Sequence, residues 1–123
     1  MEGFKVTIID GSKDFTAREK IKVKDTSAMV LLNDAVKTGD VIIDVDGFAV
    51  LSVENPKSEN GEYTQTVLID KNGTYYVTGS QSLHDSFIDI YADMKDEQEP
   101  WSLRVYTKPS KNFSGNFITC TIV

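Results

Sequence analysis

One segment with a helical repeat of apolar residues stands between β-rich segments, and this order restricts the fold more than any other feature. The apolar residues of this segment recur at the spacing of one helix face: Leu83, Phe87, Ile90, Tyr91 and Met94. Ser80 or Ser82 can cap its start, and Pro100 prevents its continuation. We therefore predict a single helix over residues 83–94.

Three β-rich segments precede this helix and two follow it. The first covers residues 41–55, with a bulge or bend predicted at Gly47. The next two cover residues 63–69 and 74–78, and the turn Asp70-Lys71-Asn72-Gly73 joins them. The last two cover residues 101–107 and 117–123. This β-β-β-α-β-β order predicts a mainly β chain with the OB-fold, a five-stranded and partly open barrel. Another small β-barrel or an α+β sandwich is the alternative.

Residues 1–39 precede the predicted barrel. Residues 5–9 indicate a strand, and Lys20-Ile21-Lys22-Val23-Lys24 alternates with period two, which predicts a strand with one basic face. Residues 29–36 can hold a short helix that ends near Gly39. We predict one OB-fold domain over residues 1–123, in which residues 1–39 are an N-terminal β extension packed on the core formed by residues 40–123.

The charge of the chain is unevenly distributed. A net charge of −6 over 123 residues argues against a polyanion as a partner. However, residues 85–99 contain six acidic residues and a single lysine, whereas residues 100–123 contain Arg104, Lys108 and Lys111 and no acidic residue. Because screening in salt limits electrostatic attraction to about 8–10 Å, the local charge decides whether a nucleic acid binds.

The fourth barrel strand carries the strongest functional pattern. Apolar residues alternate along this strand with basic and aromatic ones. One face is therefore apolar, with Trp101, Leu103 and Val105, and the other carries Arg104, Tyr106 and Lys108. Basic side chains bind the phosphates of single-stranded nucleic acid and aromatic rings stack on its bases. Lys111 and Phe113 extend the pattern into the following loop. The alternative is an ordinary solvated strand face.

Further candidates lie on the other predicted strands and loops. Phe48 and Tyr63 can stack on bases or fill the barrel. Lys57 lies in the loop 56–62, next to the binding face that an OB-fold forms on its middle strands. Lys20 and Lys22 can guide a phosphate backbone, or they belong to a charged edge strand that prevents aggregation.

The residues able to support catalysis or metal binding form no known pattern. His84 and Asp85 are neighbours on a predicted helix and do not face each other. Asp44 and Asp46 share a strand face but lack a third ligand for a cation, and Cys120 lies in an apolar strand. We therefore expect no enzymatic activity, no cofactor and no metal site.

Several segments resemble one known family: Gly47–Leu51, Asp70–Ser80, Phe87–Tyr91, Lys108–Gly115 and Phe117–Cys120. They are similar to the single-stranded-DNA-binding proteins of bacteriophages that infect Gram-positive hosts. The resemblance covers residues 40–123. It implies an OB-type fold, no enzymatic activity, and sequence-independent coating of single strands during phage DNA replication or recombination. Tyr106, Lys108, Lys111 and Phe113 are then the DNA contacts.

The resemblance also implies replication or recombination proteins as partners and the host cytoplasm as location. No apolar run is long enough to span a membrane, so we expect no membrane association. The chain departs from bacterial proteins of this function, which end in an acidic tail, because it ends Thr121-Ile122-Val123. The alternative function is a protein-interaction module, such as a phage structural or host-inhibiting protein, that uses the acidic face of the helix.

Overall fold

The computed structural model describes residues 5–54, 62–109 and 116–123. Eight strands are present in these ranges: β1 (Lys5–Gly11), β2 (Val30–Leu31), β3 (Val41–Ile43), β4 (Val45–Glu54), β5 (Glu62–Asp70), β6 (Tyr75–Thr78), β7 (Leu103–Pro109) and β8 (Asn116–Ile122). The α-helices are α1 (Ala17–Lys24), α2 (Leu32–Ala35) and α3 (Gln81–Met94), and two 3₁₀ turns, η1 (Thr26–Ala28) and η2 (Val36–Thr38), flank α2 in the chain.

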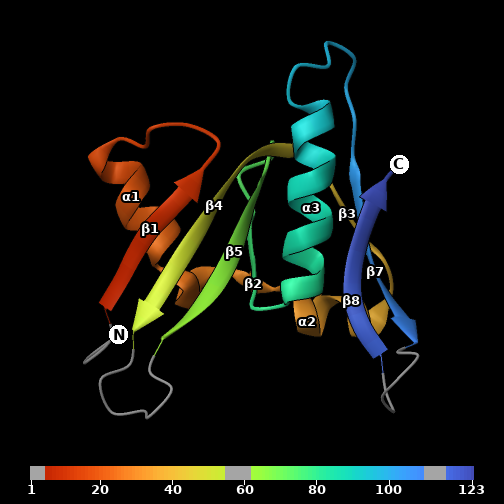
Figure 1. Cartoon of the computed structure of the whole chain (residues 1–123), viewed down its shortest axis with the longest axis horizontal. Helices are drawn as coiled ribbons and strands as arrows, with labels where there is room; N and C mark the ends of the chain where they lie inside the picture. Colours follow the sequence, from red (N-terminus) through yellow and green to blue (C-terminus); the bar gives the residue numbers. More distant parts are fainter. Residues whose placement is uncertain (1–4, 55–61, 110–115) are drawn as a thin grey trace.

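The strands form two sheets, with α3 between them (Figure 1). Sheet A has the order β1-β4-β5-β6-β2 and sheet B has the order β3-β7-β8. The chain is therefore mainly β with one long helix, as predicted. Within the described residues no ladder joins β6 to β8, so the barrel is not closed and the predicted OB-fold is not established.

The β-rich run of residues 41–55 is divided at Asp44, and the prediction of one continuous strand is wrong. β3 pairs with β7 in sheet B, whereas β4 pairs with β5 in sheet A. Asp44 belongs to neither ladder, because its backbone groups bond elsewhere. Its N–H donates to the Asp70 carboxylate (3.1 Å) and its carbonyl accepts from Lys71 N (2.9 Å). The bulge predicted at Gly47 is confirmed by a register shift between Val45 and Gly47.

The turn between β5 and β6 is also as predicted. The buried Asp70 carboxylate accepts from the N–H of Asn72 (2.9 Å) as well as from Asp44, so it fixes the turn to the start of β4. Gly73 has φ +92°, a left-handed conformation that glycine adopts without strain.

Helix α3 lies along the edge of β8 at which another strand could otherwise pair. Ser80 caps the helix by accepting from Leu83 N (3.2 Å), as predicted. The hydroxyls of Ser80 and Ser82 both donate to the carbonyl of Ile118 on β8, at 3.3 and 2.7 Å. The helix thereby covers a strand edge that would otherwise be open to pairing with another chain.

Sheet A is covered on both of its faces. One face packs against α3 and sheet B, in a cluster that includes Phe48, Leu68 and Phe87. The opposite face packs against the N-terminal segment, in a second cluster that includes Phe15 and Val23. Consecutive residues of β4 point to opposite faces, which explains why residues 47–53 are all buried.

The segment Lys20–Lys24 is a helix, and the prediction of a strand there is wrong. It belongs to α1, which begins with a capping box: Thr16 Oγ1 accepts from Glu19 N (3.2 Å), and Thr16 N donates to Glu19 Oε1 (3.0 Å). Val23 is the one buried residue of α1. The strand predicted at residues 5–9 is confirmed as β1, and the short helix predicted before Gly39 is confirmed as α2 with η2. β1 and β2 are the two edges of sheet A.

Candidate nucleic-acid interface

The outer face of sheet B carries the basic and aromatic residues that the alternation of β7 predicts. Leu103 and Val105 are fully buried on the inner face. Arg104, Tyr106 and Lys108 therefore point to the outer face, where Arg104 and Lys108 are exposed and Tyr106 is half-buried. We call these three residues the β7 stripe.

The two cations of the β7 stripe flank the aromatic ring between them. The guanidinium carbon of Arg104 lies 4.5 Å from the centroid of the Tyr106 ring, and Lys108 Nζ lies 5.8 Å from it. Both distances are within the range of cation–π attraction, about 6 Å. The contacts hold the ring and the two charges together as one surface.

Arg104 is also paired with a carboxylate of the same chain. Its Nε lies 2.6 Å from Asp40 Oδ2, and both side chains are about half exposed. The positive charge of Arg104 is therefore largely compensated in the free protein, which the sequence did not indicate. Within the described residues no carboxylate pairs with Lys108, so Lys108 is the cation that the stripe offers to a phosphate without competition.

Phe117 is a residue of this surface that sequence reasoning missed. It faces Lys108 across the β7–β8 pair, so the two side chains share the outer face. Its side chain is 38% exposed. Ile42, exposed on β3, lies in the same way opposite Arg104. The register of the hairpin is the signal that identifies Phe117, because each residue of β7 then has a known partner on β8.

Three of the candidate residues lie outside the described residues: Lys57, Lys111 and Phe113. Their proposed DNA contacts stay predictions.

Phe48 fills the core and cannot be a base-stacking platform in this fold. Its side chain is 5% exposed. It makes edge-on ring contacts with Phe87 and Tyr91 of α3, at centroid distances of 5.2 and 4.8 Å. Of the two interpretations of Phe48 from the sequence, filling of the interior is the correct one.

The structure does not bring Tyr63, Lys20 and Lys22 to the β7 stripe. Tyr63 is 46% exposed but lies on β5 of sheet A. Lys20 and Lys22 are exposed on α1, at the opposite end of the molecule from β7 and β8 (Figure 1). Because each residue of a helix turns by about 100°, these two lysines lie about 200° apart around α1, and they do not form the predicted basic strand face.

The middle strands of sheet A do not offer the open binding face expected from the sequence. Val67 on β5 and Val77 on β6 point to the outer side, but they are buried beneath the cluster that contains Phe15 and Val23. A nucleic acid cannot reach this part of the sheet while α1 and its flanking residues are in place. The outer face of sheet B is therefore the accessible candidate surface.

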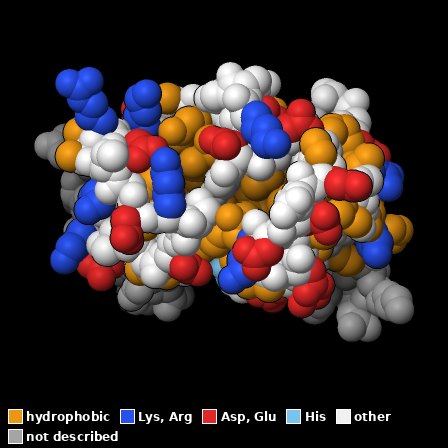
Figure 2. Space-filling model, turned by 90° about the horizontal axis from the view of Figure 1, so that it is seen from above, with side chains coloured by type: hydrophobic (Ala, Val, Ile, Leu, Met, Phe, Trp, Pro, Cys, Tyr) orange, Lys and Arg blue, Asp and Glu red, His pale blue; other side chains and the backbone are white. Residues whose placement is uncertain are grey.

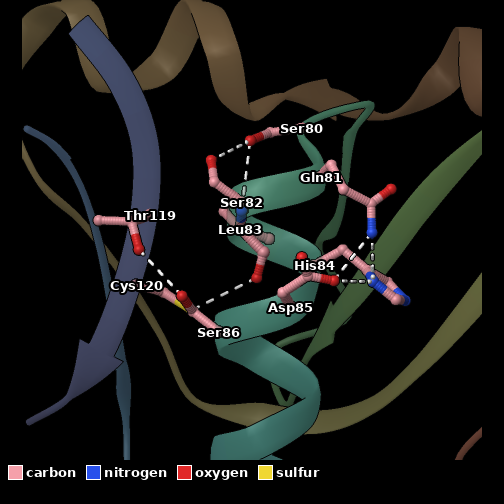
Figure 3. A network of polar contacts seen from close by, with 9 residues as sticks. All are labelled: Ser80, Gln81, Ser82, Leu83, His84, Asp85, Ser86, Thr119 and Cys120. Carbon is pink, nitrogen blue, oxygen red and sulfur yellow. Dashed lines mark hydrogen bonds and ion pairs between the residues drawn. The ribbon is translucent and has the colours of Figure 1, made fainter. Parts of the chain in front are cut away.

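Polar contacts around α3 hold the helix in place (Figure 3). Gln81 Nε2 donates to Asp85 Oδ1 (2.8 Å), and this bond, together with one from His84, lowers the pKa of Asp85. On the other side of the helix, Ser82 and Ser86 contact β8. The serine hydroxyls thus point away from His84, an arrangement unsuited to a nucleophile and its general base.

The remaining candidates for chemistry are Cys120 and Asp44. Burial raises the pKa of the Cys120 thiol to about 12. Asp44 accepts a hydrogen bond from the hydroxyl of Ser102. The described part of the chain contains no group of three side chains able to hold a metal ion.

None of the helices described here is long and apolar enough to cross a membrane. No protein-family model, no curated protein and no solved structure matches this chain.

Proposed function

We propose that this protein binds single-stranded DNA without sequence preference and without catalysing a reaction on it. The observation that carries the proposal is the β7 stripe, in which Arg104 and Lys108 flank the ring of Tyr106 on an accessible sheet face. Phosphates pair with the cations, and bases stack on Phe117, on Tyr106 or on the plane of the Arg104 guanidinium.

The pairing of the strands supports this proposal. β3 pairs in sheet B and β4, which follows it directly in the chain, pairs in sheet A, so the two sheets share one run of residues. The strand pairs therefore connect β6 to β5, β5 to β4, and, through β3, sheet A to β7 and β8. Taken as one bent strand, β3 and β4 are the first of five strands, and α3 lies between the third and the fourth. We infer an OB-type barrel that α3 completes along β8, an architecture suited to binding oligonucleotides.

The resemblance of residues 40–123 to phage single-stranded-DNA-binding proteins supports the biological setting. We propose that the protein coats and protects strands exposed during phage DNA replication or recombination in the host cytoplasm. Proteins of those pathways are the expected partners.

A titration with oligo-dT tests the function. We expect the tyrosine fluorescence to fall on binding, because Tyr106 lies in the interface, and the affinity to fall as salt rises, because bound phosphates release counterions. Oligo-dA of the same length should bind with similar affinity. If neither the fluorescence of the protein nor the electrophoretic mobility of the oligonucleotide changes at low salt, the proposal is wrong.

The acidic side of α3 supports a second candidate function. Asp85, Asp89 and Asp93 are exposed and spaced by four residues, so they lie on one helix face. A protein-interaction module that uses this face would bind a basic protein partner and be indifferent to oligonucleotides. Pull-down with Asp89→Asn and Asp93→Asn variants, in parallel with the oligo-dT titration, distinguishes the two functions.

A further inference from the structure

Helix α1 carries the largest group of uncompensated cations in the described part of the chain. Its basic side chains are all exposed: Arg18, Lys20, Lys22 and Lys24. None of them has an ion-pair partner among the described residues. The one acid of the helix, Glu19, is held instead by Lys13 at 2.6 Å. This contrasts with Arg104, which forms an ion pair with Asp40.

The arrangement of these cations is unfavourable for the helix on its own. Arg18 and Lys22 are four residues apart, as are Lys20 and Lys24, so each pair places like charges on adjacent turns, and the two pairs lie on either side of the exposed Ile21. Arg18 also lies in the first turn, where the helix dipole disfavours a cation, whereas Lys22 and Lys24 lie in the last turn, where it favours one. An anionic partner bound along α1 would relieve both kinds of repulsion.

A hollow beside α1 provides space for an apolar or aromatic group of such a partner. It has a volume of about 420 Å³ and is lined by Ile21 and Lys22 of α1 and by Asp25, Met29 and Tyr75, among others. Ile21 is 70% exposed. Lys22 and Tyr75 in its wall suit the phosphate and the base of a nucleotide, whereas the carboxylate of Asp25 in the same wall disfavours a phosphate next to it.

The α1 surface and the β7 stripe lie at opposite ends of the molecule. Figure 1 shows α1 at one end of the longest axis and β7 and β8 at the other. The same axis is horizontal in Figure 2, where Lys and Arg side chains are seen at both ends and, toward the α1 end, lie among Asp and Glu side chains. Between the two ends lies α3, whose exposed Asp85, Asp89 and Asp93 would repel a polyanion that crossed the molecule on this side.

We propose that one molecule holds two separate segments of single-stranded nucleic acid, one on the β7 stripe and one along α1. A protein that holds two segments brings complementary strands together and so promotes their annealing, without sequence preference of its own. The β7 end of this proposal rests on the proposed function, whereas the α1 end rests on the exposed cations of α1 and the hollow beside them.

The number of short oligonucleotides bound per protein molecule tests the proposal. Oligo-dT of about six nucleotides is near the lower limit for one such domain, and native mass spectrometry at saturation counts the bound copies. We expect two copies on the native chain. The variant Lys20→Gln/Lys22→Gln/Lys24→Gln should bind one, since glutamine preserves helix propensity while removing charge. The variant Tyr106→Ala/Lys108→Ala should also bind one.

A matched control removes the same charge elsewhere. Lys5→Gln/Lys37→Gln/Lys95→Gln changes three exposed lysines away from α1, and it should still bind two copies and anneal complementary oligonucleotides at the native rate. Two bound copies in the α1 variant would overturn the proposal. One copy on the native chain, lost in Tyr106→Ala/Lys108→Ala, would also overturn it but would leave the proposed function standing. No binding to the native chain would overturn both.

Discussion

Asp40 Oδ2 lies 2.6 Å from Nε of Arg104, so the arginine beside Tyr106 has a carboxylate partner within the chain. The two residues are 64 positions apart, and the pair forms because Asp40 directly precedes β3, the strand that pairs with β7. A phosphate that binds Arg104 must therefore compete with Asp40. This contact tunes the interface rather than preventing its use, because exposed ion pairs contribute only about 0.2–1 kcal/mol.

The variant Asp40→Asn should bind oligo-dT about two- to fivefold more tightly, as about 1 kcal/mol or less of competing attraction is removed. Its thermal stability should stay close to that of the native chain. Asp93→Asn is the control, because it removes the same charge from exposed α3. An affinity of Asp40→Asn at or below that of Asp93→Asn would show that Arg104 does not contact the DNA.

Truncation of Phe48 should affect folding and not the interface directly. Phe48→Ala removes a ring that packs edge-on against Phe87 and Tyr91, and large-to-small changes of this kind lower the free energy of unfolding by about 3–5 kcal/mol. Urea denaturation measures the loss. A variant with native stability that fails to bind oligo-dT would instead identify Phe48 as a DNA contact.

The N-terminus of α1 should be sensitive to acid. The pKa of Glu19 is lowered from 4.5 to about 2, first by the hydrogen bond from Lys13 and then by that from the Thr16 N–H. Since the folded-state pKa is below the unfolded value, the stabilisation is complete above pH 4.5 and disappears as the pH falls to about 2. Hydrogen exchange should show weaker protection of α1 at pH 2 than at pH 5.

The variant Glu19→Gln provides the control for this pH effect. Glutamine can still fill its place in the capping box, but it has no carboxylate to protonate. Protection of α1 in this variant should be nearly constant between pH 5 and pH 2. If the native chain and Glu19→Gln lose protection equally over this range, another group is responsible.

Cys120 should be unreactive in the native protein. Its thiol is buried, has a pKa of about 12, and lies 3.8 Å from the carbonyl oxygen of Leu83. The thiolate that reacts with alkylating reagents is therefore almost absent at pH 8. Iodoacetamide should label the unfolded chain rapidly and the native chain slowly, and rapid labelling of both would place the thiol at the surface.

The sequence predicts the C-terminal half of the fold well because local signals agree there. The helical spacing from Leu83 to Met94, the cap at Ser80 and the turn at Asn72-Gly73 each specify the structure within a few residues. The alternation of β7 likewise places Arg104, Tyr106 and Lys108 on one face.

The N-terminal segment is mispredicted because two local patterns compete. Lys20–Lys24 alternates like a strand, but Thr16 and Glu19 form the capping box of a helix, a signal that is present in the sequence itself. The burial of Val23 against sheet A favours the helix. The ion pair of Asp40 with Arg104 and the position of Phe117 opposite Lys108 both depend on strand register, which no local sequence signal specifies.

The most direct test of the interface compares the salt dependence of oligo-dT binding in three proteins: the native chain, Tyr106→Ala/Lys108→Ala, and the control Tyr63→Ala/Lys71→Ala, which removes one exposed tyrosine and one exposed lysine away from sheet B. Loss of one stacked ring, worth about 1–3 kcal/mol, and of one phosphate contact should weaken binding by the β7-stripe variant at least about tenfold. Its slope against log salt should be shallower by about 0.7, and the control should behave like the native chain. Native affinity in Tyr106→Ala/Lys108→Ala, with loss of binding in the control, would contradict the account.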